Sequence, residues 1–315
     1  MADNPADKPA DKPADNPADN PADNPAVVRP MRAEDVGPAY SCQYASLQEA
    51  GRRFGWEMPD EVTPAMRERG QARIAHLLDT DPDGAWVAER EGAVIGLGMA
   101  LVREHLWFLS LLMVATEAQE RGLGRRLLDA CLATSDGCRA SWLMATLDPR
   151  ALRRYQRAGF ALHPAHEAGG VLDRAAMPAV RGVRAGDYDN DRDLVEEVFL
   201  AQRGARMGPD LDYCRRRGMG LWVTDEPGGR GCAVSGESGP GNLAATTEEA
   251  ARALLWTSLA EATAPSLSVM CMTGAQQWAI DVCLDGGLSL SAGPDLCLRG
   301  DVGPLSPYLP SGAFG

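Results

Sequence analysis

Three segments of the N-terminal half recur in the C-terminal half of this chain, in the same order. The matched pairs are VRPMRAED (28–35) with VRGVRAGD (180–187), GAWVAE (84–89) with GLWVTD (220–225), and MATLDPRALRRYQRAGF (144–160) with MCMTGAQQWAIDVCLDGGL (270–288). Self-similarity of this kind indicates repeated copies of one structural unit. We therefore predict two domains of the same fold, 27–170 and 171–315, and the length of 315 residues suffices for two cores.

The N-terminus has a different composition. Residues 2 to 25 are six tandem tetrads of the form A-D-[NK]-P. A proline at every fourth position blocks helix and sheet, and no large apolar side chain is available for burial. We predict a disordered tail over residues 1–26.

Composition excludes several classes of function. The net charge of −13 argues against nucleic acid as a partner. The longest apolar run, 106–115, is too short to cross a bilayer, and the N-terminus does not resemble a secretory signal. The eight cysteines include no Cys-x-x-Cys pair and none is spaced with histidine as a metal ligand. We expect free thiols, no metal site and a cytoplasmic location.

Hydrophobic periodicity predicts a mixed α/β fold. Residues 86–102 alternate as strand, turn and strand, and 106–114 reads as a buried strand. Apolar residues at helical spacing follow at 127–132, then a strand at 140–147 and a helix from about Pro149 that ends at Gly159. Each copy should therefore contain a mixed, mostly antiparallel sheet flanked by helices.

The stretch QERGLG at 119–124 joins the buried strand to the helical segment. Glycines at a strand-to-helix junction let backbone N–H groups converge on an anion, and the helix N-terminus adds partial positive charge. Two groups of arginines surround the junction: Arg121, Arg125 and Arg126, and then Arg150, Arg153, Arg154 and Arg157. A polyanionic ligand and a solvated helix face with a routine glycine turn both fit this spacing.

Two other phosphate-binding motifs do not fit. A dinucleotide fingerprint needs a third glycine where Leu127 stands. A P-loop needs Gly-Lys-Ser/Thr, but Gly124 is followed by two arginines.

The segment Leu112-x-Val114-x-Thr116-x-x-Gln119-x-x-Gly122-x-Gly124 resembles the acetyl-CoA signature of GNAT-type (Gcn5-related) N-acetyltransferases. Thr116 replaces a common proline. Downstream, Asp148-x-x-Ala151-x-x-x-Tyr155-x-x-x-Gly159-Phe160 is similar to a second family segment, with aspartate in place of the frequent asparagine. The resemblance is strong over residues 27–165, and the whole chain resembles tandem GNAT proteins of actinobacteria.

The resemblance implies an acetyl-CoA site. The residues that it assigns to cofactor binding are Leu112, Met113, Val114, Gln119, Glu120, Arg121, Gly122, Leu123, Gly124, Arg125, Arg126, Asp148 and Tyr155. It also implies transfer of the acetyl group to an amine, which we expect to belong to a small molecule. A longer acyl donor is an alternative, and so is a CoA-dependent sensor or interaction module without turnover.

For catalysis, the resemblance implies an oxyanion held by a strand backbone N–H, with Val114 as the donor. Tyr155 matches the usual general acid, which returns a proton to the leaving thiolate. On spacing alone, a ring packed beside Leu152 and Phe160 is the alternative for Tyr155. Candidates for a general base are Glu104, His105 and Glu89, and we select Glu104.

The second copy lacks these features. With Leu254-Leu255 aligned on Leu127-Leu128, Gly122 falls on Glu249 and Gly124 on Ala251. Two carboxylates at TTEEAARALL would repel a pyrophosphate, and Tyr155 aligns with Cys283. We expect the second copy to be degenerate and to cover the acceptor side of the first.

Overall fold

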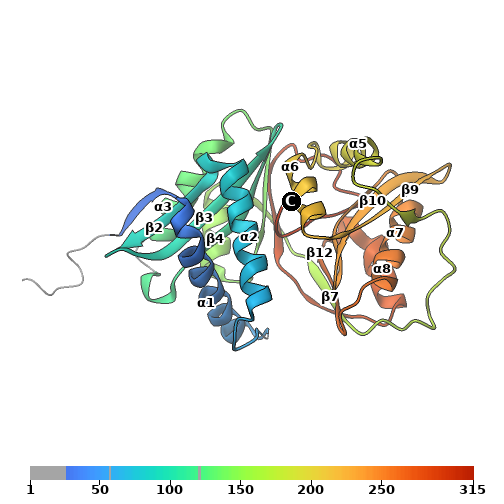
Figure 1. Ribbon diagram of the computed structural model, residues 1–315, viewed down its shortest axis with the longest axis horizontal. Helices are drawn as coiled ribbons and strands as arrows, with labels where there is room; N and C mark the ends of the chain where they lie inside the picture. The colour runs from blue at the N-terminus through green and yellow to red at the C-terminus, as the bar shows by residue number, and fades with distance from the viewer. Residues whose placement is uncertain (1–25, 57, 120–121) are drawn as a thin grey trace, which may run out of the picture.

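The structure is a computed structural model that describes residues 26–56, 58–119 and 122–315. Of the predicted tail, only Ala26 is among them. The chain folds into a mixed α/β architecture whose two halves lie side by side (Figure 1). This confirms the predicted fold class.

Within its described residues, the first half contains six strands of one sheet and four helices. In chain order they are β1 (Val27–Pro30), α1 (Val36–Phe54), α2 (Pro64–Thr80), β2 (Ala85–Arg90), β3 (Ala93–Arg103), β4 (Leu106–Val114), α3 (Leu123–Leu132), β5 (Ala140–Ala145), α4 (Pro149–Arg157) and β6 (Ala161–His163). Short 3-10 turns occupy Ala33–Asp35, Pro82–Gly84, Thr116–Ala118 and Ala133–Ser135. The predicted strands and helices agree with these bounds to within a few residues.

The second half repeats this order of elements. They are β7 (His166–Gly170), β8 (Arg184–Ala185), α5 (Arg192–Arg203), α6 (Pro209–Arg216), β9 (Gly220–Glu226), β10 (Gly229–Gly236), β11 (Gly239–Ala245), α7 (Glu248–Ala260), β12 (Leu267–Met272), a 3-10 turn (Gly274–Gln276), α8 (Gln277–Asp285), β13 (Ser289–Ala292), β14 (Asp295–Gly300) and β15 (Tyr308–Leu309).

The structure shifts the register of the first sequence repeat. Arg29 pairs with Asp35 at the start of α1, and Arg184 pairs with Asp191 at the start of α5. The sequence match had aligned Asp35 with Asp187. The segment VRGVRAGD has two arginines three residues apart, so a shift of three residues still aligns an arginine with Arg29, and the second half has one more residue before its aspartate, Asp191.

Alternate residues of strand β3 lie on the two faces of the first sheet. Leu97, Met99 and Leu101 pack in the core with α1 and α2. On the other face, a Cβ at Gly98 would lie 2.7 Å from Sγ of Cys131 on α3. Glycine at this position therefore lets α3 lie close against the sheet, which fixes where its N-terminus points.

The first sheet opens between β4 and β5. These parallel strands pair only from Leu106 to Leu109, so the end of β4 has no partner on that side. Ser110 is an extra residue in β4, because Ala100 pairs with Leu109 and Met99 with Leu111. A bulge of this kind bends a strand and interrupts its pairing. The gap beside residues 110–114 is the result.

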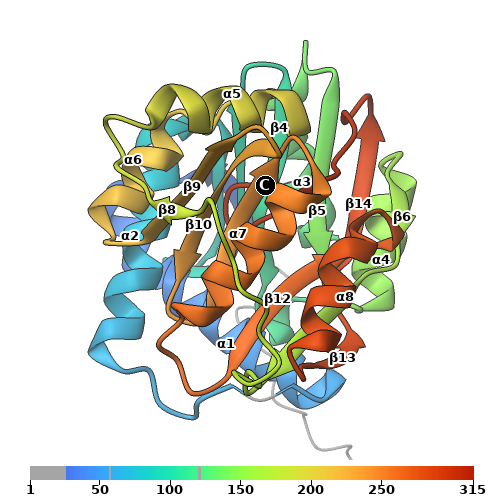
Figure 2. The same cartoon turned by 90° about the vertical axis from the view of Figure 1, so that its right-hand side faces the viewer.

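The two halves exchange one strand each. β14 lies between β5 and β6 in the first sheet, as Figure 2 shows, and β7 lies between β12 and β13 in a three-stranded sheet of the second half. Hydrogen bonds therefore cross a boundary at residue 170 in both directions. The division into 27–170 and 171–315 stays a prediction about the sequence repeat.

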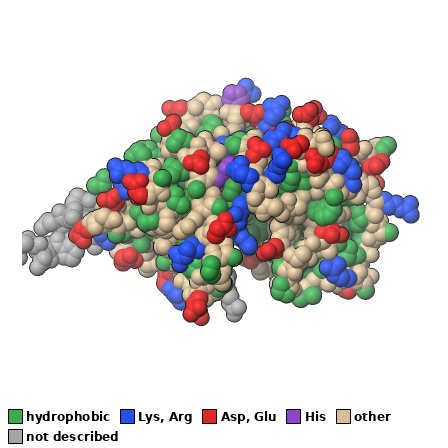
Figure 3. Space-filling view, viewed as in Figure 1, with side chains coloured by type: hydrophobic (Ala, Val, Ile, Leu, Met, Phe, Trp, Pro, Cys, Tyr) green, Lys and Arg blue, Asp and Glu red, His purple; other side chains and the backbone are tan. Residues whose placement is uncertain are grey.

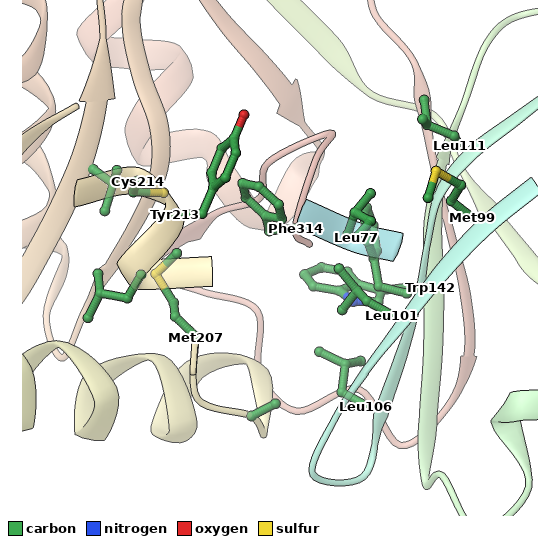
Figure 4. Close-up of a cluster of buried hydrophobic side chains, with 14 of the residues drawn as sticks. Leu77, Met99, Leu101, Leu106, Leu111, Trp142, Met207, Tyr213, Cys214 and Phe314 are labelled. Carbon is green, nitrogen blue, oxygen red and sulfur yellow. The ribbon is translucent and has the colours of Figure 1, made fainter. Parts of the chain in front are cut away.

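The core between the halves is continuous. Leu77, Leu101 and Trp142 of the first half belong to the same buried cluster as Met207 and Phe314 of the second (Figure 4).

A buried polar network crosses the same interface. Asp210 of α6 accepts from Arg103 Nε at 2.8 Å and contacts His76 Nε2 at 2.8 Å. Arg103 also binds Asp81 at 2.9 Å. Burial opposes ionisation of Asp210, but its hydrogen bonds with His76 and Arg103 outweigh burial, so the pKa of Asp210 lies below its usual value.

Candidate functional site

Helix α3 begins without a side-chain cap among the described residues. Its N-cap, Gly122, has φ of +72°, a conformation that favours glycine. The N–H groups of Arg125 and Arg126 donate to the Gly122 carbonyl oxygen at 3.1 Å, whereas those of Leu123 and Gly124 have no acceptor among the described residues. Gln119 Nε2 donates to the Val114 carbonyl oxygen at 3.0 Å, which fixes the turn to the end of β4. Glu120 and Arg121, two predicted cofactor ligands, lie outside the described residues.

Gly124 lies beneath an arginine from the neighbouring helix. A Cβ at Gly124 would lie 2.9 Å from the guanidinium of Arg154 on α4. Arg154 pairs with no carboxylate of the described residues. Its positive charge adds to the partial positive charge of the α3 N-terminus at one point. An anion bound there would satisfy both.

This point lies in a cleft of about 570 Å³. The cleft is lined by the end of β4, the start of α3, one face of α1 and the exposed side of α4, including Leu112, Met113, Val114, Gln119, Gly122, Leu123, Gly124, Arg125 and Asp148. An adjoining cavity of about 300 Å³ shares Gln119 and Asp148 with it. The structure therefore brings most of the predicted cofactor residues together.

Two predicted ligands have other contacts. Arg125 lines the cleft, but its Nε lies 3.5 Å from Asp129 one turn along α3. Arg126 Nη1 donates to the Ala26 carbonyl oxygen at 2.9 Å, which holds this side chain toward β1. Arg126 is not among the residues that line the cleft. Its assignment to cofactor binding stays a prediction.

Sequence reasoning missed the contribution of α1 and of α4. Ser46, Leu47 and Ala50 of α1 line the cleft, and α4 contributes Arg150, Arg153, Arg154 and Arg157. The arginines had been noted as a cluster but not assigned to cofactor binding. Their spacing of three and four residues, which places side chains on one helix face, was the available signal.

The register of β4 turns the backbone of Val114 into the gap. Ala115, which follows β4, donates its N–H to the carbonyl oxygen of Ile95 in β3 at 2.9 Å, so these two residues form a hydrogen-bonded pair between the strands. In an antiparallel ladder the next pair, Val114 with Gly96, directs its N–H and C=O outward. The Val114 carbonyl is the acceptor for Gln119, and the Val114 N–H faces the side where β5 diverges.

Asp148 caps helix α4. Its side chain accepts from Arg150 N at 2.9 Å and pairs with the Arg150 guanidinium at 2.8 Å. Burial opposes ionisation, but both kinds of hydrogen bond from Arg150 outweigh it, and the pKa of Asp148 lies below its usual value. Its carboxylate is thus engaged with the helix start while it lines the cleft.

Tyr155 lies deep on the inner side of α4. Its ring is 6 % exposed and packs edge-on against Phe160 at a centroid distance of 6.4 Å. Its cluster includes Leu143 of β5 and Cys297 of the exchanged strand β14. Burial raises the pKa of Tyr155 far above its usual value, so the phenol is protonated throughout the neutral range. Tyr155 is not among the residues that line the cleft, so its role as proton donor stays a prediction.

The structure does not bring Glu104 to the cleft. Glu104 lies in the turn before β4, where its carboxylate accepts from Arg206 Nη1 at 2.6 Å and from Arg206 N at 2.8 Å. Ten residues of extended chain, about 33 Å, separate it from Val114. Glu89 is paired with an arginine of β1, and His105 shares the turn with Glu104. The prediction of Glu104 as the general base is therefore corrected: it joins the two halves.

The equivalent place in the second half is built differently. Thr247 Oγ1 accepts from Ala250 N at 3.2 Å and so caps α7. Glu249 is in the first turn of α7, and its side chain lies beside Gly228. Cys283, the residue aligned with Tyr155, is buried with its Sγ 3.9 Å from Sδ of Met272.

The described residues contain no group of three or more His, Cys, Asp or Glu side chains that could hold a metal ion. Among the helices of the described residues, none has the length and apolar character needed to span a membrane.

Sequence comparison identifies the domain that contains the cleft. Residues 49–160 match the model of the acetyltransferase (GNAT) family. This segment is therefore similar to GNAT acetyltransferases. The match ends at Phe160, the last residue of the second motif, and it includes every described residue of the cleft except Ser46 and Leu47. No curated protein matches the chain.

Solved structures extend the GNAT fold over both halves. A protein of Pyrococcus horikoshii, provisionally assigned as an acetyltransferase, has a TM-score of 0.71 at 17 % identity, covering 92 % of this chain and 96 % of that one. A Gcn5-related N-acetyltransferase of Sphaerobacter thermophilus has a TM-score of 0.57 at 14 % identity, covering 87 % and 95 %. A tandem GNAT protein of the clavulanic acid pathway has a TM-score of 0.55 at 16 % identity, covering 88 % and 98 %. This chain therefore has the tandem GNAT fold.

Proposed function

We propose that the GNAT domain binds acetyl-CoA in the cleft beside α3 and transfers the acetyl group to an amine of a small molecule. The observation that carries the proposal is the uncapped α3 N-terminus with the Arg154 guanidinium above Gly124. Backbone donors, a helix N-terminus and an arginine at one point suit a pyrophosphate. A thioester can then extend along the unpaired edge of β4.

The transfer needs two groups of the protein, a hydrogen-bond donor for the carbonyl oxygen and an acid for the leaving thiolate. The acceptor nitrogen attacks the carbonyl carbon, the new C–N bond forms and the C–S bond breaks. The carbonyl oxygen gains negative charge during attack, and the outward N–H of Val114 is its proposed donor. The nitrogen releases one proton to water, the leaving thiolate takes one from Tyr155, and the Tyr155 phenolate regains a proton from water. Burial raises the pKa of this phenol, which keeps Tyr155 protonated until the thiolate forms but also makes it a weaker acid.

The role of Tyr155 is tested by Tyr155→Phe. Because the ring is retained, packing against Phe160 should survive, and we expect unchanged acetyl-CoA affinity with kcat lower by about 100-fold. The measurement is acetyl-CoA titration by calorimetry alongside thiol release with a panel of amines. The matched control is Cys283→Ala in the second half, which should leave turnover unchanged. Acetyl-CoA binding without turnover by the wild-type protein on any amine would favour a sensor over an enzyme.

A further inference from the structure

A second cavity, of about 840 Å³, lies between the two halves of the molecule. Its walls combine α1, α2 and the second half, with Tyr40, Tyr44, Arg73, Tyr213, Trp222 and Phe314 among the lining residues. Figure 3 shows the hollow between the halves. This volume is in the range of cavities that hold small organic molecules.

The cavity is adjacent to the cleft of the GNAT domain. Helix α1 lines both: Tyr40 and Tyr44 face this cavity, and Leu47 and Ala50 face the cleft. Residues 44 and 47 are about 4.5 Å apart along a helix axis. A molecule in the cavity therefore lies next to the place proposed for the acetyl group.

Arg73 lines this cavity and pairs with no carboxylate of the residues that the structure describes. Two other lining arginines are paired: Arg69 lies 3.4 Å from Glu237, and Arg217 lies 2.5 Å from Glu68. Arg73 makes no hydrogen bond or ion pair with any described residue. Burial lowers its pKa, as expected for a charge that no carboxylate compensates. A bound anion would supply the missing partner.

The floor around Arg73 is rigid. One turn further along α2, His76 contacts Asp210 at 2.8 Å and packs against the Tyr213 ring at a centroid distance of 4.7 Å. Tyr213 in turn packs edge-on against Phe314 at 5.3 Å, and both are drawn in Figure 4. A pre-formed wall of this kind orders its ligand at small entropic cost.

We propose that this cavity receives the acceptor, and that Arg73 binds a carboxylate on it, so that the substrate is an amine that also carries a carboxylate and an aromatic or other apolar body. The inference rests on the proposed acetyl transfer. One guanidinium matches one carboxylate in a planar, two-point contact. The aromatic rings suit an apolar body. Glu237 and Glu261 at the exposed rim disfavour anions of higher charge, such as phosphates.

The test uses two matched pairs of probes, L-phenylalanine with phenethylamine and L-tryptophan with tryptamine. Each is titrated by calorimetry into the wild-type protein, Arg73→Gln, Arg73→Lys and the control Arg67→Gln, an exposed arginine of the same helix. We expect an amino acid to bind the wild type and the control equally, and at least tenfold more weakly in Arg73→Gln. Arg73→Lys should recover part of the loss, because it keeps the charge but not the two-point geometry. The amines without a carboxylate should bind all four proteins alike.

Two results would overturn the inference. One is equal affinity of the amino acids for the wild type and Arg73→Gln, and the other is no binding of either amino acid to the wild type. Acetyl-CoA is titrated into the same preparations. If acetyl-CoA binds while the amino acids do not, only this inference fails. If acetyl-CoA does not bind the wild type, the proposed function itself fails.

Discussion

Helices α3 and α7 hold equivalent places in the two halves, but the N-terminus of α7 has a side-chain cap and the N-terminus of α3 has none among the described residues. α3 starts at a glycine with positive φ, carries no side-chain cap among the described residues, and has an arginine above its first turn. α7 starts at Thr247, which accepts from Ala250 N, and has Glu248 and Glu249 in its first turn. A capped, acidic start stabilises a helix by itself, whereas an uncapped start keeps its donors for a ligand.

The sheets differ in the same sense. The end of β4 has an unpaired edge in the first half, whereas Leu243 and Ala244 of β11 pair with β15 from the end of the chain. In the second half the chain itself occupies the edge where the first half has a gap. One fold thus supports a ligand cleft in one copy and a closed, stabilising structure in the other.

The largest effect on stability should come from disrupting the buried polar network of Asp210, Arg103 and His76 between the two halves. Asp210→Asn leaves Arg103 buried without its full counter-charge, and we expect a loss of about 3–5 kcal/mol in the free energy of unfolding. Denaturant unfolding measures it, with the exposed pair member Asp189→Asn as a control that should change stability by under about 0.5 kcal/mol.

This loss should depend on pH. The pKa of Asp210 is lowered in the folded protein, so its stabilisation is fully present above its unfolded pKa, about 3.9, and is lost as pH falls through the folded value. The difference between wild type and Asp210→Asn should therefore be constant at neutral pH and shrink under acid. A difference unchanged below pH 3 would contradict this assignment.

The second effect concerns the open helix start. In Gly124→Glu the new carboxylate would meet the Arg154 guanidinium, neutralise it and occupy the anion position. We expect acetyl-CoA affinity to fall by at least 100-fold, about 2.7 kcal/mol. Gly274→Glu, at an exposed glycine with open space in the second half, should bind normally. A Gly124→Glu protein that is folded and binds acetyl-CoA as well as wild type would show that no anion of the cofactor binds at this position.

The smallest effect concerns the closed helix start. Thr247→Ala removes the α7 cap and should lower the free energy of unfolding by about 1 kcal/mol without changing acetyl-CoA affinity. Thermal unfolding and calorimetry on one preparation measure both. A change in affinity with no change in stability would show that the second copy also takes part in binding.

Local patterns predicted much of this molecule. The strand 106–114, the glycine turn and the helix that follows Asp148 were readable, because periodicity and capping are properties of neighbouring residues. The exchange of β7 and β14 was not, because each strand pairs with residues far from it in the sequence. The prediction for Glu104 was wrong because Glu104 precedes the start of β4 and the cleft lies at the other end of that strand, which the sequence alone did not indicate.

The cavity at Arg73 could not be predicted from local sequence patterns either. Its walls come from α1, α2, α6 and the end of the chain. Only the packed structure shows that Arg69 and Arg217 pair with carboxylates, whereas Arg73 pairs with no carboxylate of the described residues.

The most direct measurement is calorimetric titration of the full chain with acetyl-CoA, read for stoichiometry. The contrast between α3 and α7 predicts one site per chain, lost in Gly124→Glu and kept in Thr247→Ala. Two sites per chain, or a single site that survives Gly124→Glu, would contradict the account.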